Sequence, residues 1–199
     1  MMLACHAIFS AYGFWLPNDP RGSWSDFVRR WELFRYGGPA TKVSARRSLA
    51  RAEHDVTARL AAKAALKYPP VSFTGRQARA IGTAFGRAAS ESAYAIHACA
   101  ILPEHVHVVV ARHQRPFERI VGHLKARATQ VLRAENLHPL AAHRRADGSL
   151  PTPWGRRGWY VYLDTPQAVR RAIRYVEQNP IREGKPPQRW KFVVGYGIA

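Results

Sequence analysis

The stretch that most constrains the fold of this chain is residues 101–110, Ile-Leu-Pro-Glu-His-Val-His-Val-Val-Val. The Pro-Glu dipeptide at 103–104 marks a tight turn, and the valine-rich run after it is typical of a strand. Residues 93–102, before the turn, also have the composition of a strand. Strands joined by so short a turn are neighbours in a sheet, so we predict that 93–102 and 105–111 pair as a hairpin.

Alternation along the second strand places His105 and His107 on one face and the valines at 106, 108 and 110 on the other, where they can pack. Two imidazoles side by side on a rigid strand can bind a divalent metal ion, although the pair needs a third ligand from elsewhere. The same pattern also fits two polar side chains on a wet surface. The pair alone therefore leaves a metal site and an ordinary strand face both open.

Three kinds of metal site compete for this histidine pair. A His-x-His-x-Asp hydrolase is disfavoured because residue 109 is Val. A three-histidine zinc hydrolase stays open, because the chain has nine histidines and seven remain beyond the pair. In the third kind of site, the remaining ligand and a nucleophile come from a distant helix near the C-terminus.

That helix is predicted to begin with Thr165 as the N-cap and Pro166 at the first position, and to run to about residue 178. Its apolar stripe consists of Val169, Ala172, Ile173 and Val176. Arg171, Tyr175 and Asn179 are four residues apart, so they share its flank. Pro180 disfavours the helical conformation for the residue before it, and we expect the helix to end there.

The remaining elements complete the predicted fold. We expect further strands at 3–10, 158–163 and 190–194 and further helices at 76–90 and 116–134. The order strand, helix, strand, strand, helix, strand, helix, strand predicts an α+β protein with a ferredoxin-like antiparallel sheet and helices packed on it. We expect one domain, 1–199, with a helical N-terminal insertion at about 18–72 that includes a possible helix at 46–66.

The charge balance indicates a polyanionic partner. The chain has 31 Lys and Arg against 13 Asp and Glu, a formal net charge of +18. Such an excess is typical of nucleic-acid binding, and the many arginines suit phosphate contacts and base stacking. Aromatic residues interleave with arginines between residues 24 and 70. They suit a single-stranded surface, or they attach the insertion to the core.

Cysteine usage and hydropathy indicate a cytoplasmic protein. Cys5 and Cys99 have no metal-binding spacing and are expected to be reduced and buried. No apolar run is long enough to span a membrane, and the N-terminus lacks the features of a secretion signal.

Two motifs together resemble a known family. Leu102-Pro-Glu-His105-Val-His107 is followed about 70 residues later by Tyr175-Val-Glu-Gln-Asn179-Pro180, with Lys125 in the helix between them. This combination resembles the single-tyrosine HUH transposases, especially the REP-associated tyrosine transposase branch. The resemblance covers roughly residues 75–185 and the first strand. The segment 24–70 has no counterpart in a compact family core.

The resemblance implies a metal-dependent transposase that nicks and rejoins single-stranded or hairpin DNA. Tyr175 would be the nucleophile that forms a 5′-phosphotyrosine, and His105, His107 and Asn179 would hold Mg²⁺ or Mn²⁺. The residues expected to contact DNA are Lys125, Arg127, Arg171, Arg174, Trp154 and Arg156. We expect a monomer or homodimer that is associated with the bacterial nucleoid and does not bind a membrane. A non-catalytic module that binds hairpin DNA or RNA, and the three-histidine hydrolase, remain as alternatives.

Overall fold

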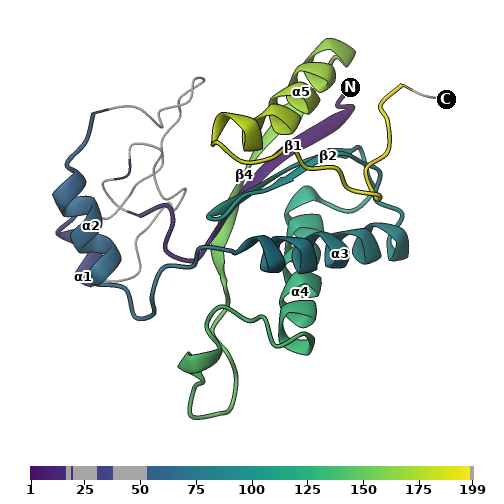
Figure 1. Cartoon of the computed structure of the whole chain (residues 1–199). Helices are drawn as coiled ribbons and strands as arrows, with labels where there is room; N and C mark the ends of the chain where they lie inside the picture. Colours follow the sequence, from purple (N-terminus) through teal and green to yellow (C-terminus); the bar gives the residue numbers. More distant parts are fainter. Residues whose placement is uncertain (17–18, 20–30, 38–52, 198–199) are drawn as a thin grey trace.

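The computed structural model describes residues 1–16, 19, 31–37 and 53–197. Its centre is a four-stranded sheet of β1 (Ala4–Ala11), β2 (Ile96–Ile101), β3 (His105–Ala111) and β4 (Trp154–Leu163), shown in Figure 1. The strand order is β2-β3-β1-β4, and all neighbouring pairs are antiparallel. This is the ferredoxin-like arrangement that the order of elements predicts.

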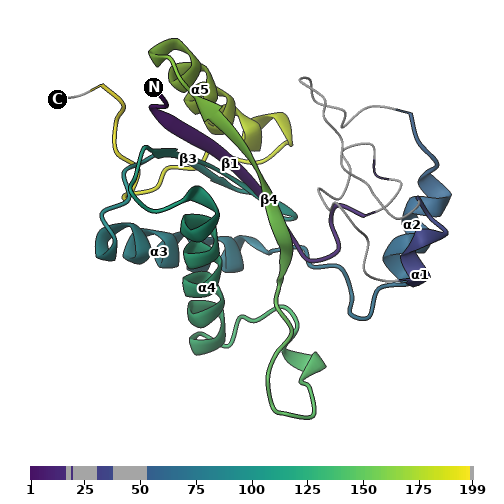
Figure 2. The same ribbon diagram turned by 180° about the vertical axis from the view of Figure 1, so that it is seen from behind.

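Helices cover both faces of the sheet. α3 (Gly75–Glu91) and α4 (Phe117–Ala134) lie on one face, and α5 (Pro166–Arg182) lies on the other (Figures 1 and 2). α3 begins with a capping box between Thr74 and Gln77. α5 begins as the sequence predicts, with the Thr165 side chain accepting a hydrogen bond from the Ala168 N–H at 3.2 Å.

The two faces of the sheet differ in chemistry. Cys5, Ala7 and Phe9 of β1 face α3 and α4, together with Val106 and Val108 of β3, in a continuous apolar core. On the α5 face, Ala4 and Val109 pack against the helix residues Val169, Ala172 and Val176. Farther along that same face, beside Ile8, lie four buried polar residues. They are His6, Ser10, His105 and His107.

Pro180 does not end the last helix, contrary to the sequence-based expectation, because α5 continues to Arg182. Proline removes one backbone donor, which costs little in the last turn of a helix, where the following N–H groups still find acceptors. The Glu183 N–H donates to the Asn179 carbonyl at 3.2 Å, and the Lys185 N–H donates to the Pro180 carbonyl at 2.8 Å. The extra turn carries Arg182 and Glu183 into the region of the histidines.

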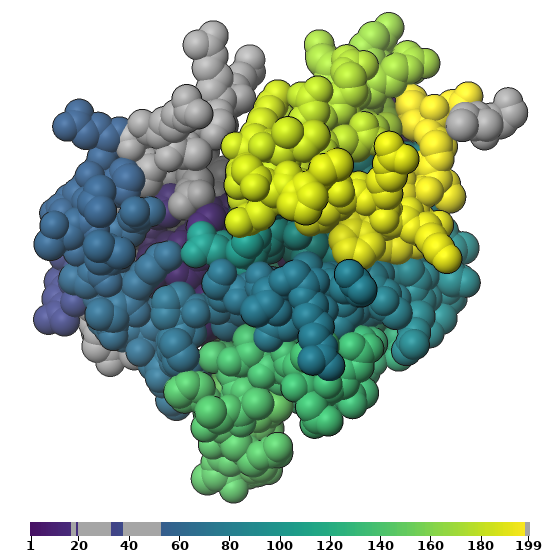
Figure 3. All heavy atoms as spheres, in the orientation of Figure 1, coloured from purple at the N-terminus to yellow at the C-terminus, as the bar shows by residue number. Residues whose placement is uncertain are grey.

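The predicted strand at 190–194 is also wrong. This segment forms a single bridge between Val193 and Ile96 and otherwise runs beside the sheet edge. Trp190 and Phe192 lie over Gly82 and Gly86 of α3, where the absence of a Cβ leaves room for the two rings. The anchoring of these rings on α3 draws the segment away from a regular ladder. Figure 3 shows it lying over α3.

The N-terminal insertion contains α1 (Trp31–Phe34) and α2 (Val56–Ala64), which lie together beyond one end of the sheet (Figures 1 and 2). The predicted helix at 46–66 corresponds to α2 in its second part, whereas 46–52 lies outside the described residues. Trp24 and the side chain of Trp31 also lie outside them, so base stacking by this segment stays a prediction.

A short 3₁₀ turn, Ala141–His143, lies in the loop before β4. Cys5 and Cys99 are free and buried, as expected. Among the helices that the structure describes, none has both the length and the apolar character needed to cross a bilayer.

Candidate active site beneath helix α5

The two histidines of β3 lie side by side in the buried polar part of the α5 face. Their ring centroids are 4.9 Å apart, and the His105 and His107 residues are 9 % and 3 % exposed. The valines that alternate with them pack on the opposite face, as the period of the strand predicts. The pair is therefore enclosed beneath α5 and does not form part of a wet strand surface.

Three polar residues are spaced four apart along α5 and its C-cap, and the first and the last of them contact this pair. The ring of Tyr175 lies 5.7 Å from that of His107, centroid to centroid, and Tyr175 is 38 % exposed. Two turns later, Oε1 of Glu183 lies 3.7 Å from Nε2 of His105. Asn179 lies between them on the same stripe of the helix and is buried. The structure therefore brings Tyr175 to the two histidines and places Asn179 on the same stripe of the helix.

His6 is a member of this cluster that the sequence reasoning missed. β1 pairs with β3 so that His6 is opposite Val109 and diagonal to His107. Nε2 of His6 lies 3.0 Å from Nδ1 of His107, and the ring centroids are 5.2 Å apart. Alternation in β1 gives the face of His6, but the register against β3 comes only from the folded sheet.

Burial sets the charge state of these histidines. It lowers the pKa of His6 to about 4. The pKa of His107 is well below its usual range, because of burial first and then the proximity of His105 and His6. Both rings are thus neutral near pH 7, which is the form in which imidazole binds a metal ion.

Arg182 is the cation that the structure brings to Tyr175. Its guanidinium carbon lies 5.5 Å from the centre of the Tyr175 ring. Burial raises the pKa of Tyr175, Arg182 opposes that effect, and Glu183 adds to it. Arg171 and Arg174, the two arginines of this helix that are predicted to contact DNA, are exposed on α5. The sequence analysis missed Arg182 because it expected α5 to end before Pro180.

Aromatic side chains from the segment just after β1 border the cluster. The Phe14 ring stacks on the His105 ring with centroids 5.2 Å apart and an interplanar angle of 5°. Trp15 lies farther out, with its ring centroid 6.3 Å from that of His105. Lys63 of α2 lies 5.9 Å from the Phe14 ring and 3.7 Å from Oε1 of Glu104. The insertion is thus in contact with the site.

Lys125 and Trp154, two residues predicted to contact DNA, are turned inward on the α4 face of the sheet. Lys125 donates to the carbonyls of Gly155 at 2.8 Å and Arg157 at 3.2 Å. Burial lowers the pKa of Lys125 to about 8. The indole N–H of Trp154 donates to Thr129 Oγ1 at 3.1 Å, and only 3 % of Trp154 is exposed. The structure does not bring either residue to the histidine cluster.

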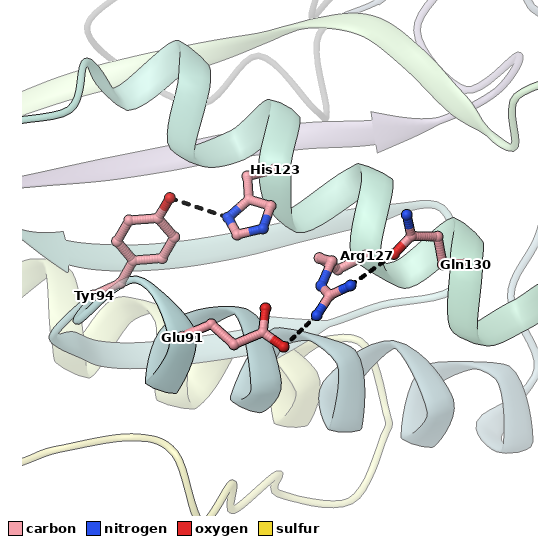
Figure 4. A network of polar contacts seen from close by, with 5 residues as sticks. All are labelled: Glu91, Tyr94, His123, Arg127 and Gln130. Carbon is pink, nitrogen blue, oxygen red and sulfur yellow. Dashed lines mark hydrogen bonds and ion pairs between the residues drawn. The ribbon is translucent and has the colours of Figure 1, made fainter.

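Arg127 and Arg156 lie on other elements than Tyr175. Arg127 on α4 pairs with Glu91 of α3 and donates to Gln130 Oε1 at 3.0 Å (Figure 4). Arg156 is exposed on β4. Of the six residues predicted to contact DNA, Arg171 and Arg174 therefore share the helix of Tyr175, and the other four lie on β4 or α4.

The donor set beneath α5 fits a hard divalent ion held by two imidazoles and an amide oxygen. Imidazole suits Mn²⁺, and amide and carboxylate oxygens suit both Mg²⁺ and Mn²⁺. No three His, Cys, Asp or Glu side chains in the described part of the chain form a group able to hold a metal ion. His6 faces a nitrogen of His107 directly, so it is not directed with His105 and His107 toward a common point. The arrangement therefore does not favour the three-histidine zinc site.

These observations define a ferredoxin-like α+β protein with a histidine–tyrosine cluster between its sheet and its last helix. No protein-family model and no curated protein matches the chain. Two solved structures to which it is similar are transposases by description. One is a REP-associated tyrosine transposase bound to a REP hairpin, with 13% identity and a TM-score of 0.47, covering 92% of this chain and 70% of that chain. The other is a proposed transposase from Deinococcus radiodurans R1, with 12% identity and a TM-score of 0.37, covering 93% and 92%.

Proposed function

We propose that this protein is a metal-dependent single-stranded DNA transesterase that uses Tyr175 as its nucleophile. The observation that carries the proposal is the position of the Tyr175 ring, 5.7 Å from the His107 ring and on the same helical stripe as Asn179. The residue is 38 % exposed, so a phosphodiester can reach the phenol from solvent. A nucleophile, candidate ligands and access thus coincide at one point.

In the proposed reaction the Tyr175 oxygen attacks the phosphorus of the scissile phosphodiester. The new bond joins the tyrosine to the 5′ phosphate, the bond from phosphorus to the 3′ oxygen breaks, and the 3′ oxygen takes up a proton. The phenol proton is released to water. Because one phosphodiester bond replaces another, a second 3′-hydroxyl can reverse the step and rejoin the strand without ATP.

His105, His107 and Asn179 would hold the metal ion, which when bound polarises the scissile phosphate as a Lewis acid. Arg182 stands over the tyrosine ring and favours the phenolate, against the burial that holds the phenol neutral. The carboxylate of Glu183 brings a negatively charged oxygen close to His105, two helical turns after Tyr175. A divalent cation would offset that charge.

The proposed substrate is single-stranded or hairpin DNA. Arg171 and Arg174 are exposed on the helix that carries the nucleophile, and the chain has a net charge of +18. Trp15, which is partly exposed at the edge of the site, provides a ring on which an unpaired base can stack. Duplex DNA keeps its bases stacked internally and cannot make those contacts.

The test is covalent capture by the parent protein, Tyr175→Phe and Tyr162→Phe as the matched control. Tyr162 is an exposed tyrosine on β4. Each protein is incubated with Mn²⁺ and a 3′-labelled hairpin with a single-stranded flank, then boiled in detergent and separated on a denaturing gel. The label follows the 5′-linked fragment, so the parent and Tyr162→Phe should give a labelled protein band and Tyr175→Phe none. An undiminished band from Tyr175→Phe would refute the proposal. Hairpin binding by the parent with no band in any protein would favour the non-catalytic binding module.

A further inference from the structure

The contact between His6 and His107 is a buried polar contact between two strands of the sheet. Nε2 of His6 and Nδ1 of His107 are 3.0 Å apart, and the two residues are 7 % and 3 % exposed. The cross-strand neighbours of His6 are apolar, Val109 on one side and Val161 on the other. A polar side chain in such surroundings is costly unless it makes a hydrogen bond, and Nδ1 of His107 provides one.

A neutral imidazole carries one N–H and one nitrogen with a free lone pair, and only the latter can bind a metal ion. Nδ1 of His107 is occupied by His6, so Nε2 is the nitrogen left to coordinate. A lone pair on Nε2 requires the proton to be on Nδ1. The contact then has one direction: the Nδ1–H of His107 donates to Nε2 of His6.

We infer that His6 is a positioning residue for the metal ligand His107. It accepts the Nδ1–H of His107, which keeps Nε2 of that ring unprotonated and fixes the ring orientation beneath α5. The inference rests on the proposed function, because it takes His107 as a ligand of the metal ion. In metal sites generally, the partner of a ligand's second ring nitrogen holds the ring orientation and the protonated nitrogen in this way.

The variants that test the inference differ in one property, an acceptor at the place of Nε2. His6→Gln retains an amide oxygen near that place, whereas His6→Leu offers a side chain of comparable size with no acceptor. Mn²⁺ affinity is measured by titration calorimetry, with His107→Ala as the reference for loss of a ligand. We expect His6→Leu to bind Mn²⁺ about 10–100-fold more weakly than the parent. His6→Gln should remain within a few-fold of the parent.

A purely structural role for His6 would give a different result. The unfolding midpoint of each variant without metal is measured alongside, so that loss of folded protein is distinguished from loss of affinity. If folded His6→Leu binds Mn²⁺ as tightly as the parent, the inference is overturned. It is overturned as well if Gln and Leu weaken binding equally.

A spectroscopic measurement tests the direction of the hydrogen bond without metal or DNA. Long-range ¹H–¹⁵N correlation spectra of the uniformly ¹⁵N-labelled parent distinguish a protonated from an unprotonated ring nitrogen. We expect His107 to carry its proton on Nδ1 in the parent and to lose that preference in His6→Leu. A parent His107 protonated on Nε2 would overturn the inference.

These results distinguish the inference from the transesterase proposal. If Mn²⁺ binding depends on His107 and His6 but no protein–DNA adduct forms, the proposed chemistry fails and the role of His6 stands. If the adduct forms and His6→Leu retains parental affinity, only the role of His6 fails. If the parent does not bind Mn²⁺ at all, both fail.

Discussion

The ring of Tyr175 on α5 lies 5.7 Å from the ring of His107 on β3, centroid to centroid. The contact crosses from the helix to the sheet at the point where the α5 face changes from apolar to polar packing. It places a phenol and an imidazole, both common in phosphoryl-transfer chemistry, at a partly exposed edge of a buried cluster.

Removal of the metal ion should abolish covalent capture and leave DNA binding largely intact. Binding depends mainly on phosphate contacts and stacking, whereas the ion would touch only the scissile phosphate. We expect a chelator or His105→Ala to eliminate the adduct. Added Mn²⁺ should restore the adduct in the chelated parent but not in the variant. Asn179→Ala should be less severe, because water can replace one neutral ligand. His97→Ala, an edge histidine that contacts the Val194 carbonyl, is the control and should cut like the parent.

Loss of the exposed α5 arginines should weaken DNA binding and reduce its salt dependence. Each phosphate contact removed lowers the slope of log affinity against log salt by roughly 1. For Arg171→Gln combined with Arg174→Gln we therefore expect a decrease of about 2, measured by fluorescence anisotropy of a labelled hairpin at several salt concentrations. Arg127→Gln should change the slope less, because Glu91 already pairs with that guanidinium. An unchanged slope in the double variant would exclude both α5 contacts.

Acidification should destabilise the metal-free protein through His6. Its pKa is lowered from the ordinary 6.5 to about 4, so between these values the unfolded chain binds a proton that the folded chain does not. The contribution of His6 to the free energy of unfolding is fully present above pH 6.5 and is lost as the pH falls toward 4, by about 3.5 kcal/mol at about 1.4 kcal/mol per pH unit. Urea unfolding between pH 7 and pH 4 measures the slope. His6→Leu should reduce the slope but not abolish it, because the pKa of His107 is lowered as well, and His143→Asn at an exposed position should leave it unchanged.

Trp154→Ala should lower the free energy of unfolding. The ring packs against Phe9 and Phe73 with centroid separations of 5.7 Å and 4.9 Å. Truncation of a large buried ring costs about 3–5 kcal/mol, and it also leaves Thr129 Oγ1 without its indole donor. Urea unfolding gives the loss, and anisotropy at a temperature where the variant is folded gives DNA affinity. A stable variant with weakened DNA binding would instead support the predicted DNA contact.

Gly82→Ala and Gly122→Ala should change stability in opposite directions. Both residues are helical, but a Cβ at Gly82 would overlap the Trp190 ring, whereas a Cβ at Gly122 meets nothing within 4 Å. We expect a loss of about 1–3 kcal/mol at Gly82 from overpacking and a gain of about 0.4–1 kcal/mol at Gly122. Adding Trp190→Ala should remove the penalty at Gly82. A penalty that persists in the double variant would show that the Trp190 contact is not its cause.

Local periodicity in the sequence determined much of the candidate site. The period of two along 105–110 placed both histidines on one face, and the spacing of four placed Tyr175 and Asn179 on one flank of a helix. The charge balance, the caps of the last helix and the order of elements rest on residues close in sequence. For that reason the ferredoxin-like sheet could be predicted without tertiary information.

Only the tertiary structure decided which residues meet across elements. The register of β1 against β3 brought His6 to His107, and the passage of α5 through Pro180 brought Arg182 over Tyr175 and Glu183 to His105. It also turned Lys125 of α4 and Trp154 of β4 inward on the α4 face of the sheet, away from the histidines. Such contacts depend on how strands align and how layers pack. These are set by burial over the whole chain and cannot be read from the spacing of neighbouring residues.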